Sequence, residues 1–292
     1  MGYRLKARGG MRKQLRRIVR SELTAALDAL DGDAPDDNGI YEARKCVKKI
    51  RAVLRLLRQP LASGYTDENA RLRTVAHDLS SLRDADATLD TVRELRGRYP
   101  NAVSPHVVRA VSHGLSARKQ RAKAEMESIV RRARKALRAS CDEVLPEIQR
   151  VGDFPAARAG AVDGYRRARA AGRDLTLDAE PAAFHEWRKR VKDHWYQVRL
   201  FARLPNGPRS RPDTLRRLET WLGKEHDLAT LNSIVIEGDD RFGDARARTL
   251  LLGSIMKRQR SLRRRSLALG HRLFGQTPKD FRASITRWWR ER

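Results

Sequence analysis

Residues 40–58 read IYEARKCVKKIRAVLRLLR, and this stretch combines two stripes at helical spacing. Apolar residues recur every three or four positions, which predicts a helix with one face in a protein core. They are Ala43, Val47, Ile50, Leu54 and Leu57. The neighbouring stripe carries only cations, at Arg44, Lys48, Arg51, Arg55 and Arg58. Like charges four residues apart destabilise an isolated helix by roughly 0.2–0.5 kcal/mol per pair, so we expect something else to offset the repulsion.

The same pattern returns in the second half of the chain. Residues 184–202 read FHEWRKRVKDHWYQVRLFA and align with residues 40–58 at an offset of 144 (184 − 40). A second pair of blocks, residues 79–84 and 222–227, aligns at an offset of 143 (222 − 79). Two blocks at nearly one offset predict two homologous helical bundles, residues 1–150 and 151–292, related by a pseudo-twofold axis. Equivalent basic helices would then face a shared space.

Apolar residues recur at helical spacing almost throughout, and runs that alternate with period two are absent. The sequence therefore predicts an all-α fold. Breaks rich in Gly, Pro, Asn and Asp divide it into about ten helices. They fall at residues 31–39, 59–64, 99–105, 151–155, 171–181, 205–212 and 237–243. The last stretch, residues 281–292, could contact a membrane or a partner helix, but docking on the protein's own surface is the favoured interpretation.

Composition restricts the classes of function. The 292 residues include 63 Lys and Arg against 36 Asp and Glu, a net charge of +27 that favours an anionic partner. The alternative explanation of the excess charge is that the whole proteome is rich in Arg, and that the surplus charges are simply exposed to solvent. Two cysteines are too few for a disulfide framework or a zinc cluster. No segment approaches the length of a membrane span, and the basic stretch at residues 3–20 has no apolar h-region, so we expect a cytoplasmic protein.

At the repeated blocks the sequence resembles the CHAD family, the conserved histidine α-helical domain. That pattern has a His shortly before an Arg/Lys-rich helix and a Leu-Gly-x-x-x-Asp-like segment after the next helix, all occurring twice. His185 to Lys192 and Leu222 to Asp227 fit the second copy. The resemblance spans about residues 9–275. It implies two helical bundles around a basic central pore that binds inorganic polyphosphate, without an established catalytic activity. Association with polyphosphate granules is then a further hypothesis about location, and we expect no cofactor. Tyr41 departs from the CHAD pattern, because it stands where the first copy would have the histidine.

These arguments give one set of predicted polyphosphate contacts from both copies. It comprises Tyr41, Arg44, Lys48, Lys49, Arg51, Arg55, His185, Arg188, Lys189, Lys192 and Arg199. Asp84 and Asp227 are predicted to cap helix starts or, as the second interpretation, to pair with a pore arginine. For a single helix such a charge run is typical of a solvated face; its duplication favours a shared site.

Two other functions stay open at this stage. Nucleic acid is the main alternative partner, since basic helices grip any phosphate backbone. A metal-dependent phosphohydrolase is the third hypothesis, and it is suggested by the dipeptides His77-Asp78 and His226-Asp227. The sequence has no Walker loop, no His-Glu-x-x-His pair and no nucleophile elbow, so no catalytic or metal-binding residues are assigned. The oligomeric state is left open.

Overall fold

The computed structural model of the chain describes residues 2–32, 35–82, 84–237 and 244–292. Within these ranges the regular elements are all α-helices, with no strand, which confirms the all-α prediction. The helices are α1 (Met11–Ala29), α2 (Asp37–Leu56), α3 (Arg58–Ser81), α4 (Asp84–Arg98), α5 (Pro105–Val151), α6 (Phe154–Arg173), α7 (Pro181–Phe201), α8 (Arg211–Glu237), α9 (Ala245–Leu273) and α10 (Pro278–Arg290).

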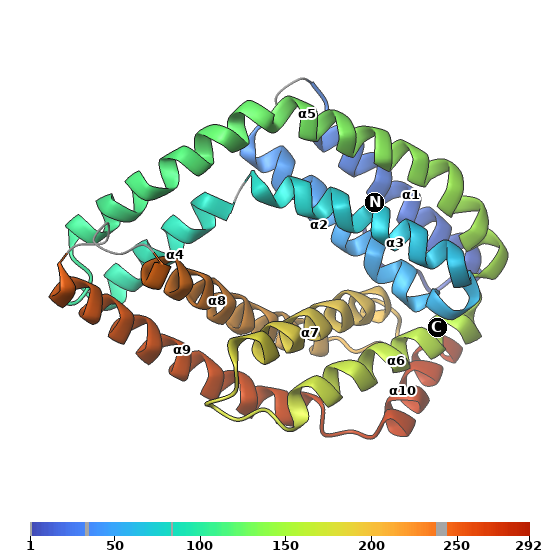
Figure 1. The fold of residues 1–292 in the computed structure, drawn as a ribbon. Helices are drawn as coiled ribbons and strands as arrows, with labels where there is room; N and C mark the ends of the chain where they lie inside the picture. The colour runs from blue at the N-terminus through green and yellow to red at the C-terminus, as the bar shows by residue number, and fades with distance from the viewer. Residues whose placement is uncertain (1, 33–34, 83, 238–243) are drawn as a thin grey trace.

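The long helices α5 and α9 form opposite edges of the molecule, and the repeated helices α2 and α7 lie between them (Figure 1). Helix α1 packs on α2 and α5, while α7 packs on α6 and α8. Helices α2 and α7 also contact each other, so the two copies of the basic stripe are neighbours in space. This contact positions the candidate site.

Several helices begin where a side chain accepts the first free backbone N–H groups. The Asp36 carboxylate accepts from the Gly39 N–H at 2.7 Å at the start of α2. Asp153 caps α6 in the same way through Ala156 N–H at 2.9 Å. Thr277 and Asp280 form a reciprocal capping box that begins α10. Such caps are worth about 1 kcal/mol each, and they set the boundaries of helices whose lengths the apolar pattern leaves open.

The core consists of two apolar clusters. The larger one joins helices from both sequence copies, including Ile18 of α1, Ile50 of α2 and Val191 of α7. The smaller one joins α4 and the start of α5 to α8 and α9, for example through Val111 and Leu231. Both clusters contain residues from before and after residue 150. The two copies therefore share their cores, and the division into two bundles at residue 150 stays a prediction.

Two details refine the predictions for the chain's breaks and its C-terminus. The predicted break at residues 59–64 is confirmed within the range of α3, because two helical segments meet there at a kink where Ala62 adopts φ 46° and ψ −119°. Of the predicted break at residues 237–243, residues 238–243 lie outside the described ranges. Helix α10 docks on α6 and α7 through Phe281, Ile285 and Trp289, which confirms the favoured interpretation of the C-terminal stretch. In the described parts of the chain, none of the helices has the length and apolar character to cross a membrane.

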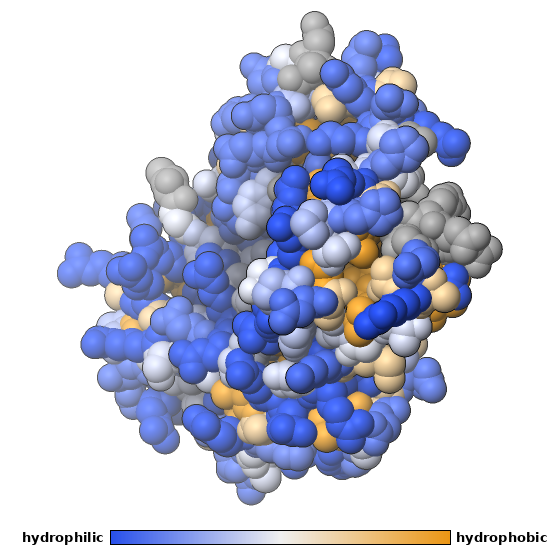
Figure 2. Space-filling view, turned by 90° about the vertical axis from the view of Figure 1, so that its left-hand side faces the viewer, coloured by the Kyte–Doolittle hydropathy of each residue, from blue (hydrophilic) through white to orange (hydrophobic). Residues whose placement is uncertain are grey.

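The surface reflects the composition. On the side of the molecule shown in Figure 2, hydrophilic residues cover most of the area and apolar residues form small patches between them. The large exposed apolar side chains include Ile236, Leu250 and Met256, around the end of α8 and the first half of α9.

The crossing of α2 and α6 provides a test of the shared core. A Cβ atom on Gly160 would overlap the carbonyl oxygen of Leu56, so Gly160→Ala should force the two helices apart and cost about 1–3 kcal/mol of unfolding free energy. Gly253→Ala in α9 is the matched control, because a Cβ there meets no atom within 4 Å and helix propensity improves. Urea denaturation should show a lower midpoint only for Gly160→Ala. Equal midpoints for the two variants would contradict this close crossing.

Candidate anion-binding site

A cleft of about 770 Å³ lies where the two copies meet, walled by residues from α2, α3, α4, α5, α7 and α8. We call it the central cleft. The predicted site residues that line it are Tyr41, Arg44, Lys48, Asp84, Arg188 and Asp227. Arg44 and Lys48 come from the first copy and Arg188 from the second, so the structure brings together these cations from both repeats.

Lys48 is the most perturbed cation in this cleft. Burial lowers its pKa to about 7, and the nearby charges of Lys192, Arg44 and Arg188 add to the shift. Glu219 acts in the opposite direction, and it pairs with Lys192 at 2.6 Å between Nζ and Oε1. The three neighbouring cations disfavour the charged form of Lys48. An anion bound beside Lys48 would stabilise that charged form.

Arg188 stands at the centre of the same cluster. Its charge lowers the pKa of His226 and opposes the burial-driven rise in the pKa of Asp227. Its Nε is buried and makes no hydrogen bond to any of the residues that the structure describes. A buried donor without a partner costs free energy, and a phosphate oxygen in the cleft could accept from it.

Carboxylates also enter the central cleft, which makes its lining less positive than the repeated stripes suggest. Asp84, Glu125 and Asp227 line it together with the cations. Burial raises the pKa of Asp227, and Arg188 and Lys192 oppose that rise. The cleft thus holds internal counter-ions for part of its positive charge.

The predicted cap role of Asp227 is wrong, because Asp227 lies inside α8 (Arg211–Glu237) rather than at a helix start. The capping prediction took the Leu-Gly-x-x-x-Asp segment for a turn, and the structure continues the helix through Gly223. The electrostatic interactions of Asp227 with Arg188 and Lys192 fit the second interpretation, pairing with a pore arginine. Asp84 is the first residue of α4 and accepts a hydrogen bond from Ser80 Oγ at 3.3 Å.

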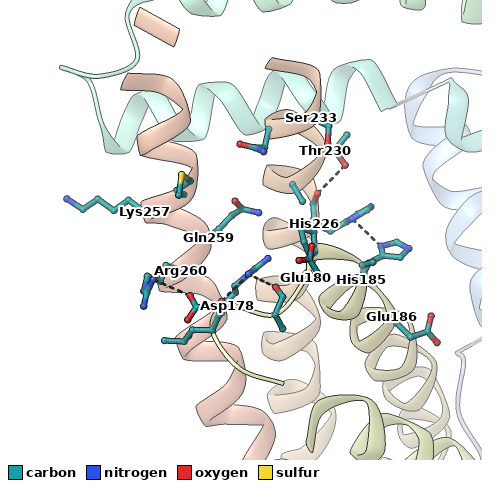
Figure 3. Close-up of a pocket in the computed structure, with 18 of the residues that line it drawn as sticks. Asp178, Glu180, His185, Glu186, His226, Thr230, Ser233, Lys257, Gln259 and Arg260 are labelled. Atoms are coloured by element: carbon teal, nitrogen blue, oxygen red, sulfur yellow. Dashed lines mark hydrogen bonds and ion pairs between the residues drawn. The ribbon is translucent and has the colours of Figure 1, made fainter. Parts of the chain in front are cut away.

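A second cleft of about 870 Å³, the side cleft, adjoins the central one on the side of α9. It is lined by His185 and Lys189 of α7, by residues of α8 and α9, and by residues 177–180. His226 lines both clefts. Figure 3 shows His226 and His185 pointing toward each other from α8 and α7, with Arg260 and Asp178 across the cleft.

The two histidines form a direct pair, with their Nδ1 atoms 3.1 Å apart. Burial is the main cause that lowers the pKa of both, and Arg188 is the next; for His226 the pKa falls to about 4. Both rings are therefore neutral at pH 7, and one Nδ1–H donates to the Nδ1 of the other. The sequence did not predict the His185–His226 pair, because no spacing rule reveals a contact between side chains of α7 and α8.

The remaining predicted contacts lie away from the central cleft, and most of them have partners within the protein. Lys49 Nζ pairs with Glu22 at 2.7 Å, and Arg55 pairs with Asp193 at 2.9 Å. Arg51 Nε donates to Asn69 Oδ1 at 3.2 Å. Lys189 lines the side cleft and pairs with Glu186, while Arg199 lies over the Trp195 ring. The reason is geometric: two helices that cross can direct only part of their stripes into one space.

Comparison with known proteins places this architecture. A family model described as the CHAD domain matches residues 10–235. The chain belongs to the CHAD family. Two solved structures are similar to it: PptA from Streptomyces chartreusis and the CHAD domain from the plant Ricinus communis. Both have a TM-score of 0.68. The PptA structure is 17% identical, and the match covers 92% of this chain and 100% of the PptA chain. The Ricinus communis structure is 15% identical, and the match covers 94% of each chain. A comparison with curated proteins gave no match.

At these identities the likeness to the two structures shows the fold alone. The CHAD match begins where the resemblance predicted, near residue 9, and ends before its predicted limit near residue 275. Tyr41, the departure from the CHAD pattern, lines the central cleft with 48% of its surface exposed. Lys45 Nζ lies 5.5 Å from its ring centroid. In the described ranges, no three His, Cys, Asp or Glu side chains are grouped as ligands for a metal ion.

Proposed function

We propose that the protein binds inorganic polyphosphate in the central cleft and holds it without catalysing its turnover. The observation that carries the proposal is the convergence of Arg44, Lys48 and Arg188, from both copies of the repeat, on one cleft. Lys192 lies close enough to perturb Lys48. Membership of the CHAD family supports the same ligand, because polyphosphate is what the resemblance implies.

The lining favours polyphosphate over nucleic acid. Proteins that hold single strands stack bases on aromatic side chains, and each stacked base contributes about 1–3 kcal/mol. Among the described residues that line the central cleft, Tyr41 is the one Tyr, Phe or Trp, and the His226 ring is already paired with His185, whereas hydroxyl and charged groups are frequent there. A polymer that consists only of phosphate needs cations and hydrogen-bond donors, and the cleft offers both.

The side cleft provides a continuation for the chain of phosphates. It adjoins the central cleft at His226 and carries Lys189, Lys257, Arg260 and Arg263 on its walls. Arg263 is held in place by Glu225 and by the carbonyls of Leu177 and Ala179. In the proposed complex the central and side clefts form one path, and the paired histidines stand at their junction.

Charge reversal in the central cleft should abolish most of the binding. Lys48→Glu combined with Arg188→Glu removes two contacts and introduces repulsion, so affinity for long polyphosphate at 150 mM salt should fall at least tenfold. The control, Arg131→Glu with Arg132→Glu, changes the net charge equally at side chains 74% and 60% exposed, and its affinity should change less than threefold. Isothermal titration calorimetry measures both. Equal losses would show diffuse attraction to the whole surface instead of a site.

Competition distinguishes polyphosphate from nucleic acid. At equal concentrations of phosphate and 150 mM salt, long polyphosphate should displace fluorescent single-stranded DNA or RNA, because the cleft has one aromatic residue for stacking. The reverse displacement should need a large excess of nucleic acid. Affinity should also fall steeply with salt, since a multidentate contact releases many counter-ions. If nucleic acid displaces polyphosphate at equal phosphate, nucleic-acid binding replaces the present proposal.

Proton uptake by Lys48 should make binding depend on pH. The pKa of Lys48 is about 7 in the free protein, and a bound anion raises it. Affinity should therefore be full below pH 7 and fall as the pH rises from 7 to 9, by at most tenfold per unit. The internal phosphates of long polyphosphate do not titrate in this window. Lys48→Arg keeps the positive charge, so its affinity should stay nearly flat, and equal slopes for the two proteins would exclude Lys48 as the titrating contact.

A further inference from the structure

A third cleft, of about 780 Å³, lies between the N-terminal segment and the end of α7. We call it the N-terminal cleft. Its walls come from residues 2–4, from residues 199–205, and from residues near the start of α8. It shares no lining residue with the central cleft or the side cleft. The proposed function does not use this cleft, although its Arg199 is among the polyphosphate contacts predicted from the sequence.

The charge of this cleft is strongly one-sided. Its walls carry Arg4, Arg199, Arg203 and Arg209 against a single carboxylate, Asp213. The central cleft, by comparison, has four cations, Arg44, Lys48, Arg121 and Arg188, against three carboxylates. Of these two clefts, the N-terminal one is therefore the more positive.

The arginines of the N-terminal cleft also lack internal counter-ions. Within the described ranges, none of the four lies within ion-pair distance of a carboxylate. By contrast, Lys49 and Arg55 of α2 and Lys192 of α7 each form an ion pair. Arg203 and Arg209 are exposed, and Arg209 Nη2 makes one long hydrogen bond, 3.5 Å, to the Pro205 carbonyl. Their guanidinium groups are thus available to an outside ligand.

The walls of the N-terminal cleft are fixed in place. Binding to a preformed site costs less free energy, because fewer side chains and loops have to become ordered. The N-terminal segment is tied to α7 by a hydrogen bond from Leu5 N–H to the Leu200 carbonyl at 2.8 Å. Gln14 accepts from Lys6 N–H, and Arg17 donates to the Arg4 carbonyl at 3.0 Å. These bonds hold the backbone that carries Arg4 at the rim.

Aromatic rings hold Arg199, the remaining arginine of the N-terminal cleft, in place. The Arg199 guanidinium lies 5.0 Å from the Trp195 ring centroid and 5.5 Å from the rings of Tyr3 and Tyr196. Tyr3 is buried and its hydroxyl donates to the Lys49 carbonyl at 3.2 Å. A guanidinium held by aromatic rings can still offer its N–H groups to an oxyanion in a bidentate contact.

We propose that the N-terminal cleft is a second anion site, which binds a compact oligophosphate of about three phosphates through Arg4, Arg199, Arg203 and Arg209. The cleft volume is that of a small-molecule site, and four guanidinium groups match the charge of tripolyphosphate. Among the described residues Tyr3 is the one Tyr, Phe or Trp in its walls, and it is buried, so the walls offer a nucleobase no exposed aromatic side chain. The ligand is either free oligophosphate or the end of a longer phosphate chain.

Calorimetric titration of the full chain with tripolyphosphate tests the site. The titrations use the variant Lys48→Glu with Arg188→Glu, so that the central cleft does not contribute. Adding Arg203→Glu and Arg209→Glu to that background should lower the remaining affinity at least tenfold. Adding Arg131→Glu and Arg132→Glu, which change the charge equally, should leave it within threefold. Arg203→Gln with Arg209→Gln repeats the test without charge reversal, and circular dichroism confirms that each variant is folded.

The outcomes separate this inference from the proposed function. Tripolyphosphate affinity that Arg203 and Arg209 do not affect, together with unchanged affinity for long polyphosphate, would overturn the second site and leave the central cleft untouched. A loss with tripolyphosphate assigns the cleft to free oligophosphate, and a loss with long chains alone assigns it to a chain end. Equal binding of citrate and tripolyphosphate would overturn the phosphate assignment. If the central variant loses long polyphosphate while Arg203 and Arg209 affect the binding of neither ligand, the proposed function stands without this inference.

Discussion

Repulsion between like charges brought together by α2 and α7 is the constraint on which the rest of this structure depends. Lys48 lies among Lys192, Arg44 and Arg188, and burial together with these neighbours lowers its pKa to about 7. The free energy that holds them together must come from elsewhere in the fold. It comes from the apolar clusters, which draw residues from both copies of the repeat, and from carboxylates placed among the cations.

The packing around these helices shows how the cluster is held. The Trp187 indole of α7 lies against Gly172 of α6 and Gly270 of α9, where a Cβ would collide with it. Gly160 brings α6 equally close to the end of α2. Helices α2 and α7 are themselves joined by an ion pair between Arg55 and Asp193 at 2.9 Å. The helices that carry these cations cannot move apart without opening these close contacts, so the proposed function uses a central cleft that is preformed.

Local rules applied to the sequence predicted the helices, their apolar faces and part of the candidate site. Helical spacing predicted the buried stripe of α2, and the repeat predicted that Arg44, Lys48 and Arg188 would share a space. The spacing could not show that Lys49 would meet Glu22 of α1 or that Lys192 would meet Glu219 of α8, because these partners are 27 residues away in each case. The His185–His226 pair and the helical position of Asp227 depend in the same way on how α7 packs against α8. Local patterns therefore predict which side chains can be near a site, and tertiary packing decides which of them are free to serve it.

The internal carboxylates bear on the kind of ligand that the central cleft would select. Glu219 already neutralises Lys192, and Asp227 interacts with both Lys192 and Arg188. A single phosphate ion would therefore replace contacts that the protein makes for itself, with little net gain. A polymer gains from many contacts at once and releases a counter-ion for each, so its affinity grows with the number of cations that it touches. Under the proposed function, the mixed charge of the central cleft discriminates by the number of linked phosphates rather than by the shape of any one of them.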